Sequence, residues 1–283
     1  MRERAAQERS LQIGRMGAAA PARAFPAVTP ERLRQALAGK RVVHGTWVQT
    51  PSPEVVEILG WAGWDFVILD LEHGPYGAEG LPHLIRAAEA AGTAPLVRVP
   101  LVAPEQVGKA LDLGAAGIVT PGVASAESAK EAVRLTRFPP HGTRGSSPST
   151  RQLHYSAKPF ASLTAADAPR PLVVLQVEAR LATSDLGSIL DVDGVDVIFI
   201  GPYDLSTSLG LPGQFDHPTV REAISEIVNR AGERGVAVGI WVPDPKAAKF
   251  WSGQGVRFVT VSNNELMLFG AASSLRRAVS RRG

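Results

Sequence analysis

Short apolar runs alternate with helical patterns along most of this chain, and this alternation limits the folds that it can adopt. Each run has the length and composition of a buried β-strand, and the intervals between runs suit helices. From residue 31 onward there are eight runs, at 42–48, 66–69, 96–99, 117–120, 172–177, 195–200, 236–241 and 258–261. Helical patterns lie between most of them, at 53–62, 81–91, 104–113, 126–137, 218–234 and 244–252.

An eightfold alternation of strand and helix predicts parallel strands closed into a (β/α)8 barrel, the TIM barrel of the α/β class. A doubly wound open sheet is the alternative. It is less favoured because residues 47–51, after the first strand, read Trp-Val-Gln-Thr-Pro and lack the glycines of a phosphate-binding loop. The 283 residues fit one α/β barrel. We predict a flexible N-terminal arm over residues 1–30 and one barrel domain over 31–283.

The composition argues against several classes of protein. The chain has no cysteine, which excludes disulfides, thiolate metal sites and thiol nucleophiles. The net charge is only +3, and the arginines near the two ends lack the interleaved aromatic residues of a nucleic-acid surface. No apolar run approaches the roughly 18 residues of a membrane span, and the N-terminal segment has no signal-peptide core. We therefore expect a cytoplasmic protein that binds neither nucleic acid nor membrane.

One connection interrupts the regular alternation. Residues 138–171 are rich in proline, serine, glycine and arginine and contain no strand candidate. Connections of this length in compact domains are usually functional. We expect short helices here and contact with a neighbouring subunit, in preference to a freely moving lid.

Charged side chains gather where the predicted strands end. In a parallel barrel these ends share one mouth, where active residues lie. The charged groups are Asp70, Glu72 and His73 after the second strand, Arg98 in the third, Glu178 after the fifth and Asp204 after the sixth. Taken singly, each acid is more often a helix cap or a surface residue. Taken together, they predict an active site at the mouth.

The residue types indicate metal-assisted chemistry on a 2-oxo acid. Glu178 and Asp204 offer two hard oxygen ligands, which suit Mg²⁺ or Mn²⁺ and leave positions for water and substrate. Pyruvate chelates well, and a metal stabilises the enolate formed at its C3. Arg98 adds a fixed positive charge, and His73 carries an imidazole, which ordinarily exchanges protons near neutral pH. Asp112 is a candidate to orient His73, although its position alone indicates a helix surface.

Several motifs resemble the HpcH/HpaI aldolase/citrate lyase family. The most specific is Gly-Val-Asp-Val-Ile-Phe-Ile-Gly-Pro-Tyr-Asp-Leu-Ser at 194–206, and a second is Gly-Trp-Asp-Phe-Val-Ile-Leu-Asp-Leu-Glu-His-Gly-Pro at 63–75. Shorter matches lie at 97–98, 111–115, 137–145 and 176–178. The resemblance extends from about Gly39 to the C-terminus.

The resemblance implies a metal-dependent class II aldolase that forms or cleaves 4-hydroxy-2-oxo acids through a metal-bound pyruvate enolate. It implies a (β/α)8 barrel in a hexamer built from dimers that exchange their eighth helix. Glu178 and Asp204 then correspond to the metal ligands, with Mg or Mn favoured and Co or Zn as alternatives. Arg98 corresponds to the enolate-stabilising arginine, and His73 with Asp112 to a base dyad.

Further positions correspond to the region around pyruvate. Gln176, Gly201 and Pro202 match residues that contact the pyruvate moiety. Asp70 and Glu72 lie beside the site, where Glu72 is positioned to orient a metal-bound water. The expected partners are a 2-oxo acid, pyruvate or oxaloacetate, and a carbonyl acceptor.

The chain departs from the family pattern near the acceptor. Tyr203 stands where alanine is common, Trp241 where a smaller aliphatic residue is usual, and Asn263 where an aspartate is common; residues 145–151 also differ. Tyr203 and Trp241 are therefore substrate-binding candidates. They keep open an alternative in which the same enolate serves oxaloacetate decarboxylation or condensation with a non-aldehyde electrophile. A non-catalytic barrel is a third reading, disfavoured because no metal ligand or base is missing.

Overall fold

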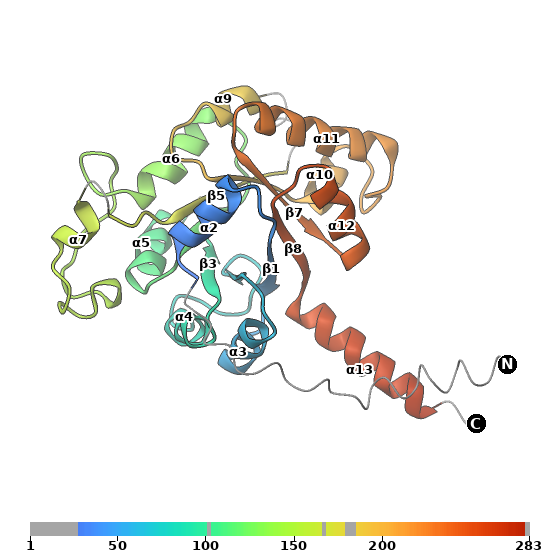
Figure 1. Cartoon of the computed structure of the whole chain (residues 1–283), viewed down its shortest axis with the longest axis horizontal. Helices are drawn as coiled ribbons and strands as arrows, with labels where there is room; N and C mark the ends of the chain where they lie inside the picture. Colours follow the sequence, from blue (N-terminus) through green and yellow to red (C-terminus); the bar gives the residue numbers. More distant parts are fainter. Residues whose placement is uncertain (1–27, 101–102, 166–167, 179–184, 281–283) are drawn as a thin grey trace.

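The predicted barrel is confirmed. The computed structural model describes residues 28–100, 103–165, 168–178 and 185–280, and its eight strands form a closed, all-parallel barrel in sequence order (Figure 1). The strands are β1 Val43–Val48, β2 Phe66–Asp70, β3 Ala94–Arg98, β4 Gly117–Thr120, β5 Leu172–Val177, β6 Val197–Ile200, β7 Ala237–Val242 and β8 Phe258–Asn263. Most of the predicted arm, residues 1–27, lies outside the described residues.

Helices surround the barrel and cover one of its ends. The outer helices are α3 Pro53–Trp61, α4 Leu81–Ala90, α5 Pro104–Asp112, α6 Ala126–Thr136, α9 Leu186–Leu190, α11 Pro218–Glu233 and α12 Pro245–Gly253. Many begin with proline, whose missing N–H costs nothing in the first turn. Helix α2, Pro30–Ala38, covers the amino-terminal end of the barrel, where Leu33 and Leu37 join the interior cluster.

The period-two alternation of each strand fills the barrel and also directs side chains to its mouth. In β5, Leu172 and Val174 belong to the interior cluster, whereas Val173 and Leu175 pack outward against helices. Because successive strand residues alternate sides, the next inward position is Gln176. The same rule brings Asp70 and Arg98 inward after Ile68 in β2 and Leu96 in β3. The fold therefore places polar groups at the last inward position of several strands.

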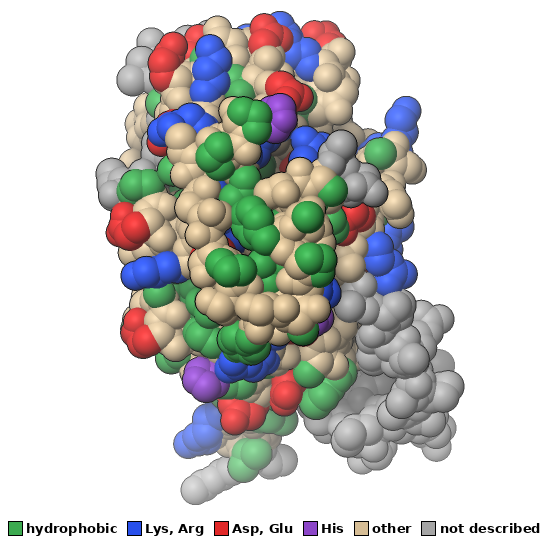
Figure 2. All heavy atoms as spheres, turned by 90° about the vertical axis from the view of Figure 1, so that its left-hand side faces the viewer, with side chains coloured by type: hydrophobic (Ala, Val, Ile, Leu, Met, Phe, Trp, Pro, Cys, Tyr) green, Lys and Arg blue, Asp and Glu red, His purple; other side chains and the backbone are tan. Residues whose placement is uncertain are grey.

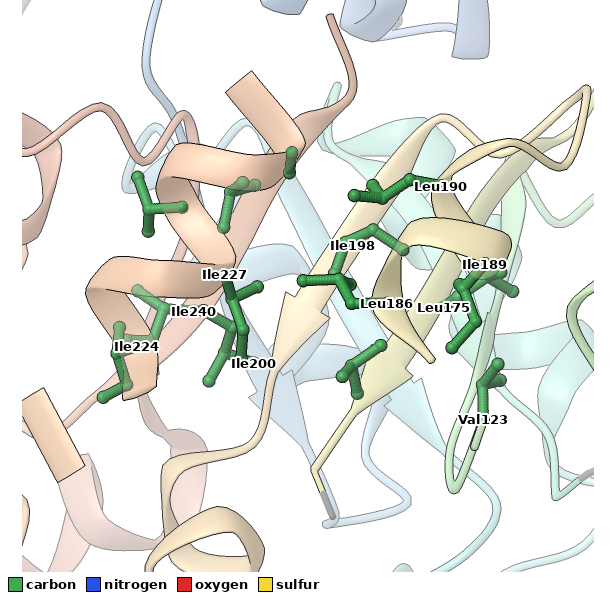
Figure 3. Packing of buried hydrophobic residues seen from close by; sticks show 14 of the residues in the cluster. Val123, Leu175, Leu186, Ile189, Leu190, Ile198, Ile200, Ile224, Ile227 and Ile240 are labelled. Atoms are coloured by element: carbon green, nitrogen blue, oxygen red, sulfur yellow. The ribbon is translucent and has the colours of Figure 1, made fainter. Parts of the chain in front are cut away.

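Outward strand residues form the larger part of the core. Figure 3 shows Leu175, Ile198 and Ile200 packed against side chains of α9 and α11, such as Ile189 and Ile227, all at most 1% exposed. Burying apolar side chains of this size stabilises a fold by roughly 1.5–3 kcal/mol each. This layer holds the strands, and with them the residues of the mouth, in fixed positions.

The interior is packed by large aromatic rings beside glycines. Phe66 and Phe258 stack with ring centroids 4.0 Å apart, and Phe199 meets Phe258 edge-on at 6.2 Å. A Cβ on Gly45 would lie 2.2 Å from the Phe66 ring. Glycine is needed there because the ring occupies the space of a side chain.

The 138–171 connection contains short helical segments, as predicted. They are the 3-10 turn η2 Arg151–Leu153 and α7 Ala161–Thr164. Figure 2 views the side of the molecule that carries this connection, and hydrophobic side chains gather near the centre of that face. Arg151 anchors the connection to the barrel helices through Glu89 and the carbonyl oxygen of Leu113. The predicted contact with another subunit stays a prediction.

The last helix does not pack along its own barrel. Helix α13, Asn264–Ser280, follows β8 directly and extends away from the barrel (Figure 1). Its exposed apolar side chains are Leu266, Leu268, Phe269, Leu275 and Val279. Across the described ranges, no helix is long and apolar enough to cross a membrane.

Candidate active site

A cavity of about 480 Å³ opens at the carboxyl end of the barrel. Eight of the predicted site residues line it: His73, Arg98, Gln176, Gly201, Pro202, Tyr203, Asp204 and Trp241. Glu178 lies at its edge, because a Cβ on Gly201 would come within 2.8 Å of the Glu178 Oε2. The structure therefore brings together most of the residues that the strand ends predict.

Arg98 is fixed in the wall of the cavity by a buried ion pair. Asp70 and Arg98 are opposite each other in the β2–β3 register. The guanidinium donates to both carboxylate oxygens, with distances of 2.8 and 2.6 Å, and its third nitrogen lies 3.1 Å from Glu72. The Cζ of Arg98 also lies 4.3 Å from the centroid of the Trp47 ring. This two-point pairing fixes the guanidinium plane as well as its position.

Asp70 is ionised and anchors the ends of the first two strands. Burial alone would raise the pKa of Asp70, but the hydrogen bonds and charge of Arg98 lower it below its usual value. Gln49 donates to the same carboxylate at 2.9 Å. The Tyr76 hydroxyl accepts from the Asp70 N–H and donates to the carbonyl of Val48, each at 2.8 Å. Asp70 thus positions Arg98 and does not itself line the cavity.

Glu178 is oriented by groups that carry no charge. Its Oε1 accepts from the N–H of Gly122 at 2.9 Å, and its Oε2 accepts from the amide of Gln176. The side-chain oxygen of Gln176 is buried and has no hydrogen-bond partner. A Cβ at position 201 would lie 2.8 Å from the Glu178 Oε2 and 3.0 Å from the Gln176 Nε2, so a larger residue would displace both side chains from these positions. The missing side chain lets the backbone approach the carboxylate closely.

The electrostatics of Glu178 are unusual for a carboxylate. Burial, reinforced by the negative charges of Asp204 and Glu72, raises its pKa to about 7. Asp204 lies in the first turn of the short helix α10, Pro202–Ser208, and not directly at a strand end. Among the described residues, neither Glu178 nor Asp204 forms an ion pair with a cationic side chain. Within the part of the chain that the structure describes, these two neighbouring acids thus share a region without a cationic partner.

The predicted pair of His73 and Asp112 is not formed within the chain. His73 is exposed and lines the cavity beside Arg98. Asp112 is the last residue of α5, and its carboxylate accepts a hydrogen bond from Arg144 at 2.7 Å. The same guanidinium also donates to the side-chain oxygen of Gln152. Burial lowers the pKa of Arg144, and the Asp112 carboxylate opposes that effect. The 138–171 connection supplies this arginine and thereby occupies Asp112.

Sequence reasoning missed part of the site. Phe215 meets Tyr203 edge-on at 4.6 Å, although it lies in the loop before α11. Gln49 accepts from Asn263 at 3.1 Å, which joins β1 to β8 where the barrel closes. The inward alternation of β1 could have indicated Gln49, two positions after Trp47. No local pattern marks Phe215.

The mouth of this barrel gathers two acids, a fixed arginine and a histidine around one cavity. This is the layout of an enzyme active site. The sequence profile of the HpcH/HpaI aldolase/citrate lyase family matches residues 44–268. The chain belongs to this family.

Relatives agree with this assignment over nearly their full lengths. The 5-keto-4-deoxy-D-glucarate aldolase of Shigella dysenteriae is 35% identical over 87% of this chain and 95% of its own. A HpcH/HpaI aldolase/citrate lyase family protein from Burkholderia cenocepacia has a TM-score of 0.83 and 34% identity, over 88% and 99% of the two chains. Citrate synthase SbnG has a TM-score of 0.76 and 29% identity, over 87% and 96%. Together they support an enzyme that breaks or forms carbon–carbon bonds.

The Asp70–Arg98 pair gives a direct prediction about stability. Asp70→Asn removes the charge that neutralises a buried guanidinium, so the free energy of unfolding should fall by about 3–5 kcal/mol. Urea unfolding followed by circular dichroism measures it. Glu131→Gln is the matched control, because it breaks a two-point pair with Arg134 on an exposed helix surface and should cost a small fraction of that amount. Equal losses in the two variants would contradict the structural role of Asp70.

Proposed function

We propose that the protein is a divalent-metal-dependent aldolase that forms or cleaves 4-hydroxy-2-oxo acids through the enolate of pyruvate. The observation that carries this proposal is the pair Glu178 and Asp204. Two acids with no cationic partner in the described part of the chain, one of them with a pKa raised to about 7, call for a bound cation. Family membership supplies independent support.

The residues fit a hard divalent ion. Glu178 and Asp204 supply two oxygen donors, and within the described residues no third His, Cys, Asp or Glu completes a protein cage. Mg²⁺ and Mn²⁺ commonly bind through one or two carboxylates and keep positions for water and substrate. Co²⁺ or Zn²⁺ are less suited alternatives. When bound, such an ion polarises the keto oxygen of a 2-oxo acid and stabilises negative charge there.

The chain's own residues perform the remaining tasks. Arg98 presents a positive charge whose direction Asp70 fixes before substrate arrives, so little reorganisation is needed as charge develops. Gln176 orients Glu178 through its amide and keeps a free carbonyl oxygen at the cavity. His73 is the proposed proton carrier for C3, since it lines the same cavity as Arg98. Asp112 accepts from Arg144 and does not orient His73 within the same chain.

A second candidate keeps the enolate and changes its fate. The enzyme would decarboxylate oxaloacetate or condense the enolate with a non-aldehyde electrophile. The likeness to citrate synthase SbnG and the aromatic side chains of Tyr203 and Trp241 favour it. Oxaloacetate loss no faster than with metal alone would eliminate the decarboxylation branch. A cytoplasmic location also stays a prediction.

Exchange of the pyruvate methyl protons tests enolate formation without any acceptor. In D₂O with Mn²⁺, wild-type protein should exchange these protons, and a chelator should stop the exchange. Arg98→Lys keeps a charge but loses the two-point pairing, so its exchange rate should fall by about 10²–10³-fold. Proton NMR follows the methyl signal. Arg134→Lys, on the exposed face of α6, is the control and should match wild type; absent exchange in wild-type protein would refute the proposal.

We also propose that α13 packs against a second copy of the chain, as an exchanged eighth helix of a dimer within a hexamer. Its apolar side chains are largely exposed, with Phe269 at 72% and Leu268 at 70%. A helix with such a face is buried in most soluble proteins.

Phe269→Glu should therefore lower the mass measured by sedimentation equilibrium, because a charge in an apolar interface is costly. Phe250→Glu, on the exposed part of α12, is the matched control and should leave the mass unchanged. A wild-type protein that sediments as a monomer would contradict the assembly.

A further inference from the structure

We infer that the carbonyl acceptor of this enzyme is an apolar, aromatic aldehyde and not an aldehyde that carries a carboxylate. The inference rests on the proposed function and concerns the part of the cavity beyond the two acids. The rings of three residues pack together there, and we call them the aromatic wall: Tyr203, Phe215 and Trp241. Their ring centroids lie 4.6, 5.1 and 6.3 Å apart pairwise, with interplanar angles of 86, 51 and 67°.

The aromatic wall stands next to the reaction centre. Tyr203 is the residue before Asp204, and both line the 480 Å³ cavity together with Arg98 and Trp241. Phe215 supports the other two rings from behind and lines a neighbouring hollow of about 230 Å³, which Trp241 also borders. An electrophile that approaches a 2-oxo acid held at Asp204 would therefore lie against the rings.

Trp241 is held in one orientation. Its indole N–H donates to the carbonyl of Ser262 at 3.2 Å. Ser262 has a φ of 59°, in the left-handed region, where the β1–β8 pairing is irregular. Holding a non-glycine residue in that region costs free energy, and such strain is often found at functional sites. Here it directs a carbonyl toward the indole and fixes the face that Trp241 presents to the cavity.

Tyr203 leaves an apolar surface open. Its side chain remains 53% exposed although two rings pack on it. Aromatic rings bind other rings by offset or edge-on contact, in addition to the area that they bury. The aromatic wall thus offers a preformed surface for a flat, apolar group.

The charges around the cavity disfavour an anionic acceptor. Among its described lining residues, Arg98 is the only arginine or lysine, whereas Asp204 and Glu265 are acidic. Arg98 is already paired with Asp70 and Glu72. Within the described residues, a carboxylate on the acceptor would find no free arginine or lysine near the rings, and its desolvation would remain uncompensated. An uncharged ring meets no such penalty.

The reaction balances without a further reactant. A proton leaves C3 of pyruvate, the bond forms between C3 and the aldehyde carbon, and the aldehyde oxygen takes up a proton. The product with benzaldehyde would be a 4-aryl-4-hydroxy-2-oxo acid.

Two measurements test the inference. Benzaldehyde and glyoxylate are compared as acceptors with Mn²⁺ and pyruvate, and the kcat/KM for benzaldehyde should be at least about tenfold higher. Binding of benzaldehyde to metal-free protein is measured by saturation-transfer NMR. Trp241→Leu and Phe215→Leu should each weaken this binding and raise the KM for benzaldehyde by about tenfold or more. Trp61→Leu, an aromatic deletion on the exposed surface of α3 that borders neither hollow, should leave both unchanged.

The outcomes separate the inference from the proposed function. If the protein exchanges the methyl protons of pyruvate but uses glyoxylate as the better acceptor, the aromatic-acceptor inference is wrong and the enolate chemistry still holds. Benzaldehyde binding that depends on Trp241, without any pyruvate exchange, would support the aromatic wall as a binding surface and overturn the aldolase. Benzaldehyde binding that is unchanged in both wall variants, or no binding at all, would also refute the inference.

Discussion

The buried pair of Asp70 and Arg98 is the interaction on which the geometry of the mouth depends. A guanidinium that is 6% exposed must be neutralised, and the carboxylate directly opposite it in the β2–β3 register does so. The same carboxylate accepts from Gln49, which in turn accepts from Asn263 at the end of β8. One ion pair therefore joins strands from both sides of the barrel closure and fixes the guanidinium that borders the cavity.

This network also reaches the last helix. Asn263 accepts from the N–H of Leu266 in the first turn of α13, at 2.9 Å. Asn264 accepts from the N–H of Gln49 and donates to the hydroxyl of Thr50. The start of the proposed assembly helix is thus tied by hydrogen bonds to the residues that hold Arg98. Glu265 and Leu266 line the cavity themselves, so the helix that extends outward also completes the mouth.

Much of the fold could be predicted because its determinants are local. Apolar runs of strand length and their alternation with helices are visible in the sequence, and inward alternation brings Asp70, Arg98 and Gln176 to one end. Contacts between segments that are distant in the sequence could not be predicted from local patterns. The partner of Asp112 comes from a connection that folds back onto α5, so the sequence suggested His73 where the structure has Arg144. Phe215 is likewise placed by a loop, and helix α10 is too short to give a periodic pattern.

The proposed cation site at Glu178 and Asp204 is central to the chemistry of this protein, and Mn²⁺ affinity as a function of pH tests it most directly. A pKa of about 7 for Glu178 means that a proton competes with the ion below neutrality. Isothermal titration calorimetry should show affinity rising by up to about tenfold per pH unit between pH 5.5 and 7 and levelling off above. Glu178→Gln should abolish the binding. Affinity that does not change over this range, or that survives in Glu178→Gln, would contradict the account.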